Sequence, residues 1–206
     1  MPRKIDVTKL KTRSRQEITH SLTRIDDAEK AQMSYLLVRW MSAMTAVELH
    51  GIWERYMEAR IVAALNHDAN HFIVAQSIAG VSQVSSGLAS FIVRGGNKYF
   101  DFRSMPELIA KADQWLGNTA NPFRGLAPED RRYIDVLAAI RNCVVHGSDA
   151  AKTAYSRHLK QTYNISYAPL PEEFLNAKDN RQGSPLRYQS RLKGLALVVE
   201  RAIGQS

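Results

Sequence analysis

The chain has 206 residues, of which 45% are hydrophobic, so it is long enough for one domain with a buried core and short for two. Its 28 Lys and Arg outnumber its 20 Asp and Glu, and the formal charge of +8 favours acidic polymers, nucleic acid first, as partners. A single cysteine, Cys143, excludes an intramolecular disulfide framework and predicts a cytoplasmic location. No stretch reaches the roughly 18 apolar residues that cross a bilayer, and the N-terminus lacks the apolar core of a signal peptide, so we expect no membrane partner.

Much of the excess positive charge lies at the start of the chain. Residues 1–15 carry one acid, Asp6, against Arg3, Lys4, Lys9, Lys11, Arg13 and Arg15. Two interpretations of this segment remain open: a solvated tail, or an arm that binds phosphate groups. We therefore predict a basic arm or short helix over residues 1–25 and a single helical domain over residues 26–206.

A long helix is predicted over residues 28–65, where Gly51 is the one Gly or Pro and apolar residues recur at helical spacing. Asp26 and Asp27 suit its N-terminus, because carboxylates there accept free backbone N–H groups and meet the positive end of the helix dipole. The apolar stripe comprises Leu37, Trp40, Met44 and Val47 and then, with a small shift of phase, Ile52, Tyr56, Ala59 and Ala63. The pattern fits one helix, or two that meet near Gly51, with a turn at residues 66–70.

Residues 71–94 are apolar but rich in Ser, Gly and β-branched residues, which predicts a broken helix that restarts after Ser85 or Ser86. The loop over residues 94–103 interleaves cations with aromatic residues. Its cations Arg94, Lys98 and Arg103 are candidates for binding RNA phosphates while the aromatics stack bases. The alternative is that the aromatic side chains pin the loop onto the core.

Further helices are predicted over residues 106–116, which end at Gly117, and over residues 128–146, which open with Pro128. Two more are predicted over residues 150–163 and 188–203, separated by an irregular segment that is rich in Pro and Gly. The fold class that follows is all-α.

The helix over residues 128–146 is amphipathic. At 100° per residue one narrow sector, the predicted core face, contains Tyr133, Leu137, Ile140 and Val144. The opposite side contains Arg131, Asp135, Asn142 and His146, accompanied by the small residues Ala138 and Ala139. This side is either a docking face for another helix or an ordinary solvent-exposed face.

The end of this helix reads Arg141, Asn142, Cys143, Val144, Val145, His146, Gly147. Cleaving RNA without a metal uses the 2′-hydroxyl as nucleophile, so it requires a group that moves protons near neutral pH and cations that stabilise the phosphorane charge. Histidine and arginine supply these, and Asn142 would orient the histidine or the phosphate. Because no His, Cys or carboxylate cluster has the spacing of metal ligands, we predict no metal and no cofactor.

The five-residue spacing places Arg141 about 140° around the helix axis from His146, so one helix does not aim both groups squarely at one phosphate. In a twofold homodimer each His could face the partner's Arg and Asn. The length of the arginine side chain softens this constraint. The spacing therefore favours a homodimer and does not require one.

An Arg, a polar residue and then a His at this spacing, on a late helix of a small α-helical domain, resembles the signature of the HEPN superfamily. Arg141, Asn142 and His146 match its positions. Residues 47–54, with the sequence VELHGIWE, are similar to the first long helix of RiboL-PSP-type HEPN domains. The resemblance implies a HEPN-like helical bundle with a long N-terminal helix, and a metal-independent endoribonuclease that acts as a toxin in a toxin–antitoxin or antiphage system. It also implies RNA, a second copy of the chain and an antitoxin protein as partners.

The family's pattern allows four to six residues between the Arg and the His. This bare spacing is not specific, because Arg13 and Arg15 with His20, and Arg60 with His67, also fit it. Glu48 is a candidate partner for an active-site cation, with Asp135 and Arg131 as further supporting residues. Each of these is also consistent with an ordinary surface role. Cys143 is expected to pack near the core and not to act as a nucleophile. The alternative functions are a non-catalytic HEPN-like RNA-binding module and a protein-interaction module.

Overall fold

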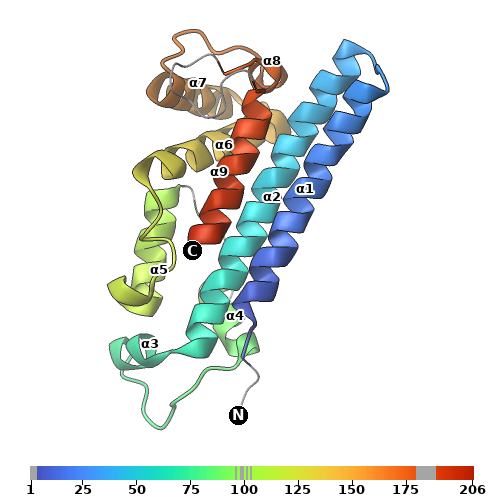
Figure 1. The fold of residues 1–206 in the computed structure, drawn as a ribbon. Coiled ribbons are helices and arrows are strands. Elements are labelled where there is room, and N and C mark those ends of the chain that lie inside the picture. The colour runs from blue at the N-terminus through green and yellow to red at the C-terminus, as the bar shows by residue number, and fades with distance from the viewer. Residues whose placement is uncertain (1–3, 96, 98–99, 101, 103, 180–188) are drawn as a thin grey trace. The chain divides into compact units, whose positions relative to one another are not determined.

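The computed structural model of the chain describes residues 4–95, 97, 100, 102, 104–179 and 189–206. Within these residues the chain forms helices, one isolated bridge between Lys178 and Ser190, and no strand (Figure 1). The predicted all-α fold is therefore confirmed. None of these helices has the length and the apolar run needed to cross a membrane. The helices are α1 (Val7–Lys30), α2 (Tyr35–His67), α3 (Asn70–Ala75), α4 (Ser86–Arg94), α5 (Met105–Ala120), α6 (Pro128–His146), α7 (Asp149–Tyr163), α8 (Pro171–Asn176) and α9 (Arg191–Gln205).

The chain divides into two compact units, each built from segments that are far apart in the sequence. The first unit contains Met1–Ser14, Trp53–Leu126 and Ile203–Ser206, and the second contains Arg15–Ile52 and Ala127–Ala202. Helices α1, α2 and α9 contribute residues to both units. The boundary predicted at residue 25 falls inside α1, and the division into an arm and one domain stays a prediction.

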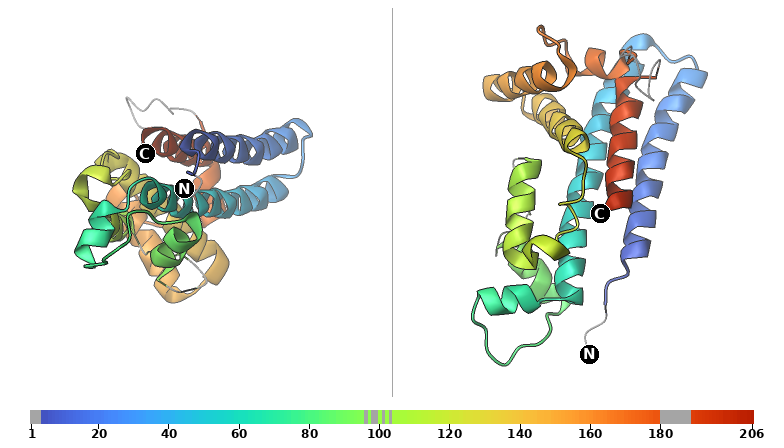
Figure 2. Two further views of the ribbon diagram at one scale, coloured as in Figure 1. Left: turned by 90° about the horizontal axis from the view of Figure 1, so that it is seen from below. Right: turned by 60° about the vertical axis from the view of Figure 1, so that its left-hand side comes forward.

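In the second unit, the later part of α1 and the first part of α2 lie side by side as a helical hairpin (Figures 1 and 2). Here α1 buries Ile18, Ser21, Ile25 and Ala28, whose spacing of three and four residues makes one narrow seam. The hydroxyl of buried Ser21 donates to the Glu17 carbonyl at 2.9 Å. This polar side chain is therefore satisfied within its own helix.

The start of α2 corrects one prediction. Apolar spacing predicts a helix from residue 28 with Asp26 and Asp27 at its N-terminus, but both lie near the end of α1. The chain turns at Gln32, which has a left-handed φ of 52°. Ser34 then precedes α2 and accepts a hydrogen bond from the Leu37 amide at 3.4 Å. A local turn and a capping serine, and not the apolar spacing, decide where the helix begins.

The first half of α2 turns its large apolar side chains outward. Leu37, Trp40 and Met44, which belong to the apolar stripe in the sequence, are 41%, 60% and 37% exposed. The opposite face is buried and consists mostly of small residues, including Ser42, Ala43, Thr45 and Ala46. Small side chains allow the backbones of packed helices to approach closely, so here they form the buried face. Farther along the stripe Ile52 and Tyr56 are buried.

Helix α6 crosses the second unit and carries the candidate catalytic residues. Pro128 occupies its first turn, where the missing N–H costs no hydrogen bond, and Gly147 ends it in a left-handed conformation with φ 59°. Both ends lie where the sequence predicts them. Tyr133 and Leu137 are buried as expected, but Ala139 is buried as well, although its helical position places it on the polar side.

Helices α7 to α9 complete the second unit around a cluster of aromatic rings. Phe174 on α8 packs edge-on against Tyr163 and Tyr155 of α7, with ring centroids 4.9 and 6.3 Å apart. The Arg191 guanidinium lies 4.7 Å from the centroid of the Phe174 ring. The prediction of an irregular segment after α7 misses the short helix α8, which Pro171 opens. The predicted helices over residues 150–163 and 188–203 correspond to α7 and α9, although α9 begins at Arg191 and residue 188 lies outside the described residues.

The first unit contains the end of α2 and helices α3, α4 and α5. Trp53 packs between Tyr56 and Phe123, with both ring centroids 5.9 Å away. Ser85 accepts a hydrogen bond from the Leu88 amide at 3.3 Å and caps α4, which confirms the predicted restart of the helix. At Gly117 the backbone leaves helical geometry with φ 72°, so the predicted end of the helix is a break within α5.

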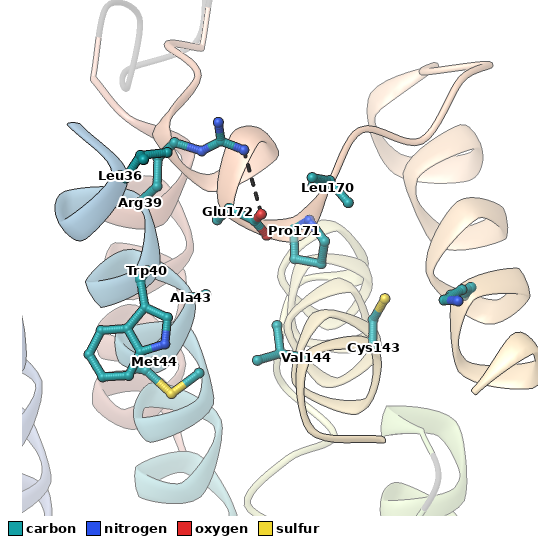
Figure 3. A pocket seen from close by; sticks show the side chains of 11 residues that line it. Leu36, Arg39, Trp40, Ala43, Met44, Cys143, Val144, Leu170, Pro171 and Glu172 are labelled. Carbon is teal, nitrogen blue, oxygen red and sulfur yellow. Dashed lines mark hydrogen bonds and ion pairs between the residues drawn. The ribbon is translucent and has the colours of Figure 1, made fainter. Parts of the chain in front are cut away.

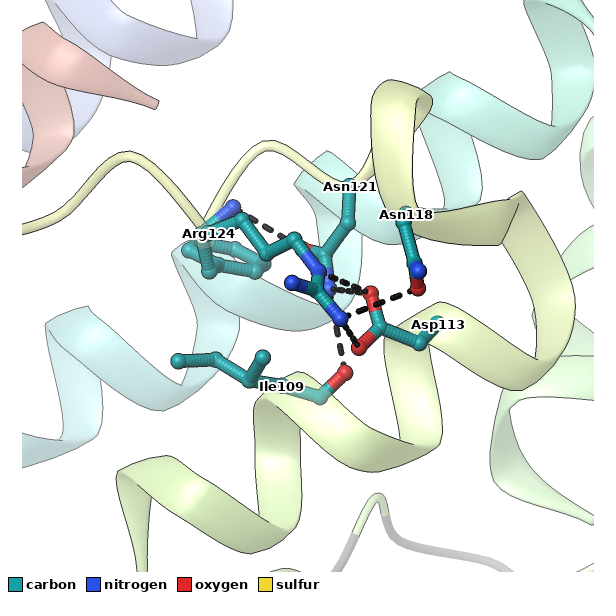
Figure 4. Close-up of polar contacts among 6 residues, drawn as sticks. Ile109, Asp113, Asn118, Asn121 and Arg124 are labelled. Atoms are coloured by element: carbon teal, nitrogen blue, oxygen red, sulfur yellow. Dashed lines mark hydrogen bonds and ion pairs between the residues drawn. The ribbon is translucent and has the colours of Figure 1, made fainter.

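A polar network holds the loop that follows α5 in the first unit (Figure 4). Arg124 donates to both carboxylate oxygens of Asp113, at 3.0 and 2.9 Å, and to the Asn118 side chain at 3.0 Å. Asn121 donates to Asp113 at 2.8 Å and to the Ile109 carbonyl at 3.0 Å. Burial alone raises the pKa of the Asp113 carboxyl, but the hydrogen bonds from Arg124 and Asn121 outweigh it and hold that pKa below its usual value.

Acid is expected to weaken this network. A carboxyl whose pKa is lowered by folding contributes stability above its unfolded pKa, about 3.9 for Asp, and loses that contribution as the pH falls through its folded pKa. The Asp113→Asn variant should therefore be less stable at pH 7 and should lose less stability than the wild type below about pH 4. Urea unfolding at several pH values measures this, with the exposed Asp27→Asn as control. An unchanged pH dependence in Asp113→Asn would contradict the role given to the network.

Candidate active site at the end of α6

The candidate catalytic residues occupy the last two turns of α6. Asn142 and His146 are exposed, and Arg141 is half-buried. The Gly147 amide donates to the Cys143 carbonyl at 3.0 Å and closes the final turn. Because helix C-termini leave backbone carbonyls unpaired, a cation placed there is favoured. The glycine cap thus leaves His146 at a helix end that faces solvent.

The structure brings the three residues together within one chain. Nη1 of Arg141 donates to Oδ1 of Asn142 at 2.8 Å and lies 3.1 Å from Nε2 of His146. When Arg141 donates to Nε2, that nitrogen carries no proton, so the ring proton lies on Nδ1. One guanidinium nitrogen therefore connects the amide and the imidazole.

This contact shows how the length of the arginine side chain offsets the angular separation of Arg141 and His146. The two Cα positions do differ by about 140° around the axis. The arginine side chain, however, is long enough to extend across Asn142 and reach the imidazole of His146. A second copy of the chain is therefore not needed to bring these two groups together.

The arrangement leaves polar groups available to a ligand. Arg141 uses Nη1 alone in its hydrogen bonds with described residues, so Nε and Nη2 remain able to donate to a phosphate. Asn142 uses its oxygen, which leaves its NH₂ group as a donor. An imidazole nitrogen with a lone pair therefore lies next to several donors that suit an anion.

The predicted supporting residues lie elsewhere. Glu48 forms an ion pair with Arg24 of α1, so the structure does not bring it to Arg141. Asp135 and Arg131 share the face of Asn142 but precede it by two and three helical turns, roughly 10 and 16 Å along the axis. Across the described ranges, no group of three His, Cys, Asp or Glu side chains could hold a metal ion.

The loop after α4 belongs to the first unit. Arg94 donates to a Glu58 carboxylate oxygen at 2.6 Å, and the other two predicted RNA-binding cations, Lys98 and Arg103, lie outside the described residues. The ring centroid of Phe100 lies 6.4 Å from that of Trp115 on α5. This contact supports the interpretation in which aromatic side chains pin the loop to the core.

Cys143 lies between the candidate catalytic residues in the sequence, and its side chain lines a groove of the second unit. Its thiol is half-buried, and this burial raises its pKa, with Lys152 lowering it and Glu172 raising it to smaller extents. A raised pKa leaves the thiol protonated at neutral pH, and the thiol is then a poor nucleophile. We expect Cys143→Ser to retain RNA cleavage within about threefold of wild type, as measured by initial rates. A loss comparable to that of His146→Ala would show that Cys143 takes part in the reaction.

A groove of about 630 Å³ with a mostly apolar lining lies along α2 and α6, and the sequence pattern does not reveal it (Figure 3). Val144 of α6 lies on the side toward Trp40 and Met44 of α2, and Cys143 lies on the other side of α6. Its complete lining is Leu36, Arg39, Trp40, Ala43, Met44, Cys143, Val144, Lys152, Leu170, Pro171 and Glu172. We call this the α2–α6 groove. Val144, predicted to lie in the core, is half-buried because it forms part of this wall.

One end of the α2–α6 groove is closed by ion pairs. Arg39 lies 2.9 Å from a Glu173 carboxylate oxygen and 3.5 Å from one of Glu172. Its side chain is 15% exposed, so these pairs hold α8 against α2 with little competition from water. Arg39 therefore pairs with both glutamates, and its one positive charge leaves the cluster of three side chains with a net charge of −1.

No protein-family model, curated protein or solved structure matches this chain. The resemblance to the HEPN superfamily therefore stays an expectation from the residues of the sequence motif.

Proposed function

We propose that the chain is a metal-independent endoribonuclease of the HEPN type. The observation that carries this proposal is the position of Arg141 Nη1, within hydrogen-bonding distance of both Asn142 and His146 at an exposed helix end. The imidazole of His146 can act as a base there, and the guanidinium and the amide can donate hydrogen bonds to an anion at the same place. The formal charge of +8 favours a polyanionic substrate.

In the proposed reaction, Nε2 of His146 removes the proton from a ribose 2′-hydroxyl. The 2′-oxygen attacks the adjacent phosphorus, and the bond from phosphorus to the 5′-oxygen breaks. That oxygen leaves with the proton that the imidazolium of His146 gives back. The products are a 2′,3′-cyclic phosphate and a free 5′-hydroxyl, so atoms and charge balance without another reactant.

Arg141 and Asn142 act on the phosphate. The free N–H groups of the guanidinium donate to the non-bridging oxygens, whose negative charge grows in the phosphorane. The Asn142 NH₂ group adds another donor and its oxygen keeps the guanidinium oriented. When substrate binds, the contact between Arg141 and His146 opens and both groups turn to the RNA.

The biological setting is part of the same proposal. A toxin of a toxin–antitoxin or antiphage system would arrest growth on expression, and Arg141→Ala or His146→Ala would relieve the arrest. Homodimerisation and binding of an antitoxin protein, which the resemblance implies, stay predictions. Sedimentation and co-purification measure them.

Incubation of the purified protein with pools of RNA in EDTA tests the activity. We expect fragments that end in a 2′,3′-cyclic phosphate, and no cleavage of DNA of the same sequence, because DNA lacks the 2′-hydroxyl. Absence of cleavage in every RNA pool would refute the proposal.

A further inference from the structure

Helix α7 exposes a face of cations and neutral polar groups. The exposed residues of this face are Lys152, Thr153, Ser156, Arg157, Lys160 and Gln161. Asp149 in the first turn is the one acidic residue of the helix, and it pairs with Lys152 at 3.8 Å. Within the described residues, neither Arg157 nor Lys160 forms an ion pair. Like charges three to four residues apart on a helix repel each other, so this face suits a polyanion that neutralises them.

The cationic face meets the α2–α6 groove at Lys152, which belongs to both. Lys152 is, with Arg39, one of the two cations that line this groove, and its pair with Asp149 is long, at 3.8 Å, and exposed to solvent. Trp40, 60% exposed, presents its indole ring in the same groove. The volume of about 630 Å³ lies in the range of small-molecule sites, so one planar base fits within it.

We propose that α7 and the α2–α6 groove bind the single-stranded RNA that flanks the scissile bond, with phosphates on Lys152, Arg157 and Lys160 and one base stacked on Trp40. Proteins bind single-stranded nucleic acid through two elements: cations that follow its phosphate backbone, and an aromatic ring on which a base stacks. Because α6 ends at His146 and α7 begins at Asp149, a strand passes from the candidate active site to α7 around a two-residue turn. This inference rests on the proposed function, because that function is what makes the bound strand the substrate.

The phosphate contacts are tested by RNA binding in EDTA, with a labelled single-stranded oligonucleotide and His146→Ala as the parent protein. Adding Arg157→Gln and Lys160→Gln should weaken binding on the order of 10-fold at 0.1 M salt. The slope of log affinity against log salt should become less steep by about 1.4, because each phosphate that a cation neutralises contributes roughly 0.7 to the slope. The control is Lys30→Gln with Lys111→Gln, which removes the same charge from surface ion pairs on α1 and α5. An equal effect in both double variants would refute specific contacts on α7.

The base contact is tested with Trp40→Ala in the same parent protein. Loss of one base stacked on an aromatic ring should weaken binding by roughly 10- to 100-fold and leave the salt slope unchanged. The quenching of tryptophan fluorescence by RNA should also disappear. The control is Phe91→Ala, which removes an aromatic side chain that is 65% exposed on α4. Unchanged RNA affinity in Trp40→Ala would refute the inference and leave the groove to another occupant, such as a partner polypeptide.

Failure of this inference and failure of the proposed function give different results. If the wild type cleaves RNA but the α7 and Trp40 variants bind it normally, the strand does not follow α7 and the function stands. If RNA binding depends on Arg157, Lys160 and Trp40 but no RNA is cleaved, the binding surface stands and the catalytic proposal is wrong. Circular dichroism and thermal unfolding confirm that each variant is folded.

Discussion

Replacing His146 with alanine is expected to reduce the single-turnover rate of RNA cleavage by about 10²- to 10⁴-fold, the usual contribution of a positioned acid–base group. Replacing Arg141 with alanine should reduce it by about 10²- to 10³-fold, because a donor to the phosphorane oxygens is lost. Both side chains reach solvent at the end of α6, so neither variant should change the melting temperature greatly. Rapid-quench kinetics with an excess of protein over RNA measure these rates.

The matched control for His146→Ala is His20→Ala. His20 follows Arg15 with the same five-residue spacing, and both are exposed on α1. The pair Arg15 and His20 therefore has the same spacing as Arg141 and His146 but does not belong to the site at the end of α6. We expect His20→Ala to cleave RNA at the wild-type rate. Equal losses in the two variants would contradict the assignment of the reaction to α6.

The largest expected loss of stability comes from Arg201→Met. Asp130, in the first turn of α6, is 1% exposed, and both of its carboxylate oxygens accept hydrogen bonds from Arg201 of α9. This hydrogen bonding raises the pKa of the Arg201 guanidinium. Removing the arginine leaves a buried carboxylate without its cation, which costs about 3 kcal/mol of unfolding free energy. Urea unfolding at pH 7 measures the change.

The reciprocal variant Asp130→Asn should cost less, about 1 to 2 kcal/mol. It leaves a guanidinium that is 44% exposed and therefore remains hydrated. The control is Arg24→Met, which breaks the exposed ion pair with Glu48 and should cost less than about 1 kcal/mol. If Asp130→Asn were more destabilising than Arg201→Met, the buried carboxylate would not be the source of the loss of stability in Arg201→Met.

Helix ends set by a local residue could be predicted from the sequence. Pro128, Gly147 and Ser85 act on their own backbone or on the next turn, so their effects do not depend on the rest of the fold. The start of α2 could not be predicted in this way. Apolar spacing continues across the turn at Gln32 and hides it.

The burial of the α2 faces could not be predicted because it depends on other helices. Trp40 is apolar, but the buried face of the first half of α2 is made mostly by smaller residues. The α2–α6 groove likewise needs residues from α2, α6, α7 and the segment that opens α8, so no single stretch of sequence indicates it.

The candidate site could be predicted in composition but not in geometry. Arg141, Asn142 and His146 lie within six residues, so the sequence alone brings them to one helix end. The reach of the arginine to the imidazole depends on its side-chain conformation, which helical spacing does not specify. The partner of Glu48 is Arg24, on another helix and 24 residues away, and nothing near Glu48 in the sequence points to it.

The central claim is that His146, Arg141 and Asn142 act on one phosphodiester bond through the neighbouring 2′-hydroxyl. The most direct measurement uses a cleavable oligonucleotide that is 2′-deoxy at every position except one, incubated in EDTA with the wild type and with His146→Ala. The account predicts that the wild type cuts after the single ribose and leaves a 2′,3′-cyclic phosphate there, while His146→Ala leaves the strand intact. Cutting at a deoxy position, or equal cutting by both proteins, would contradict it.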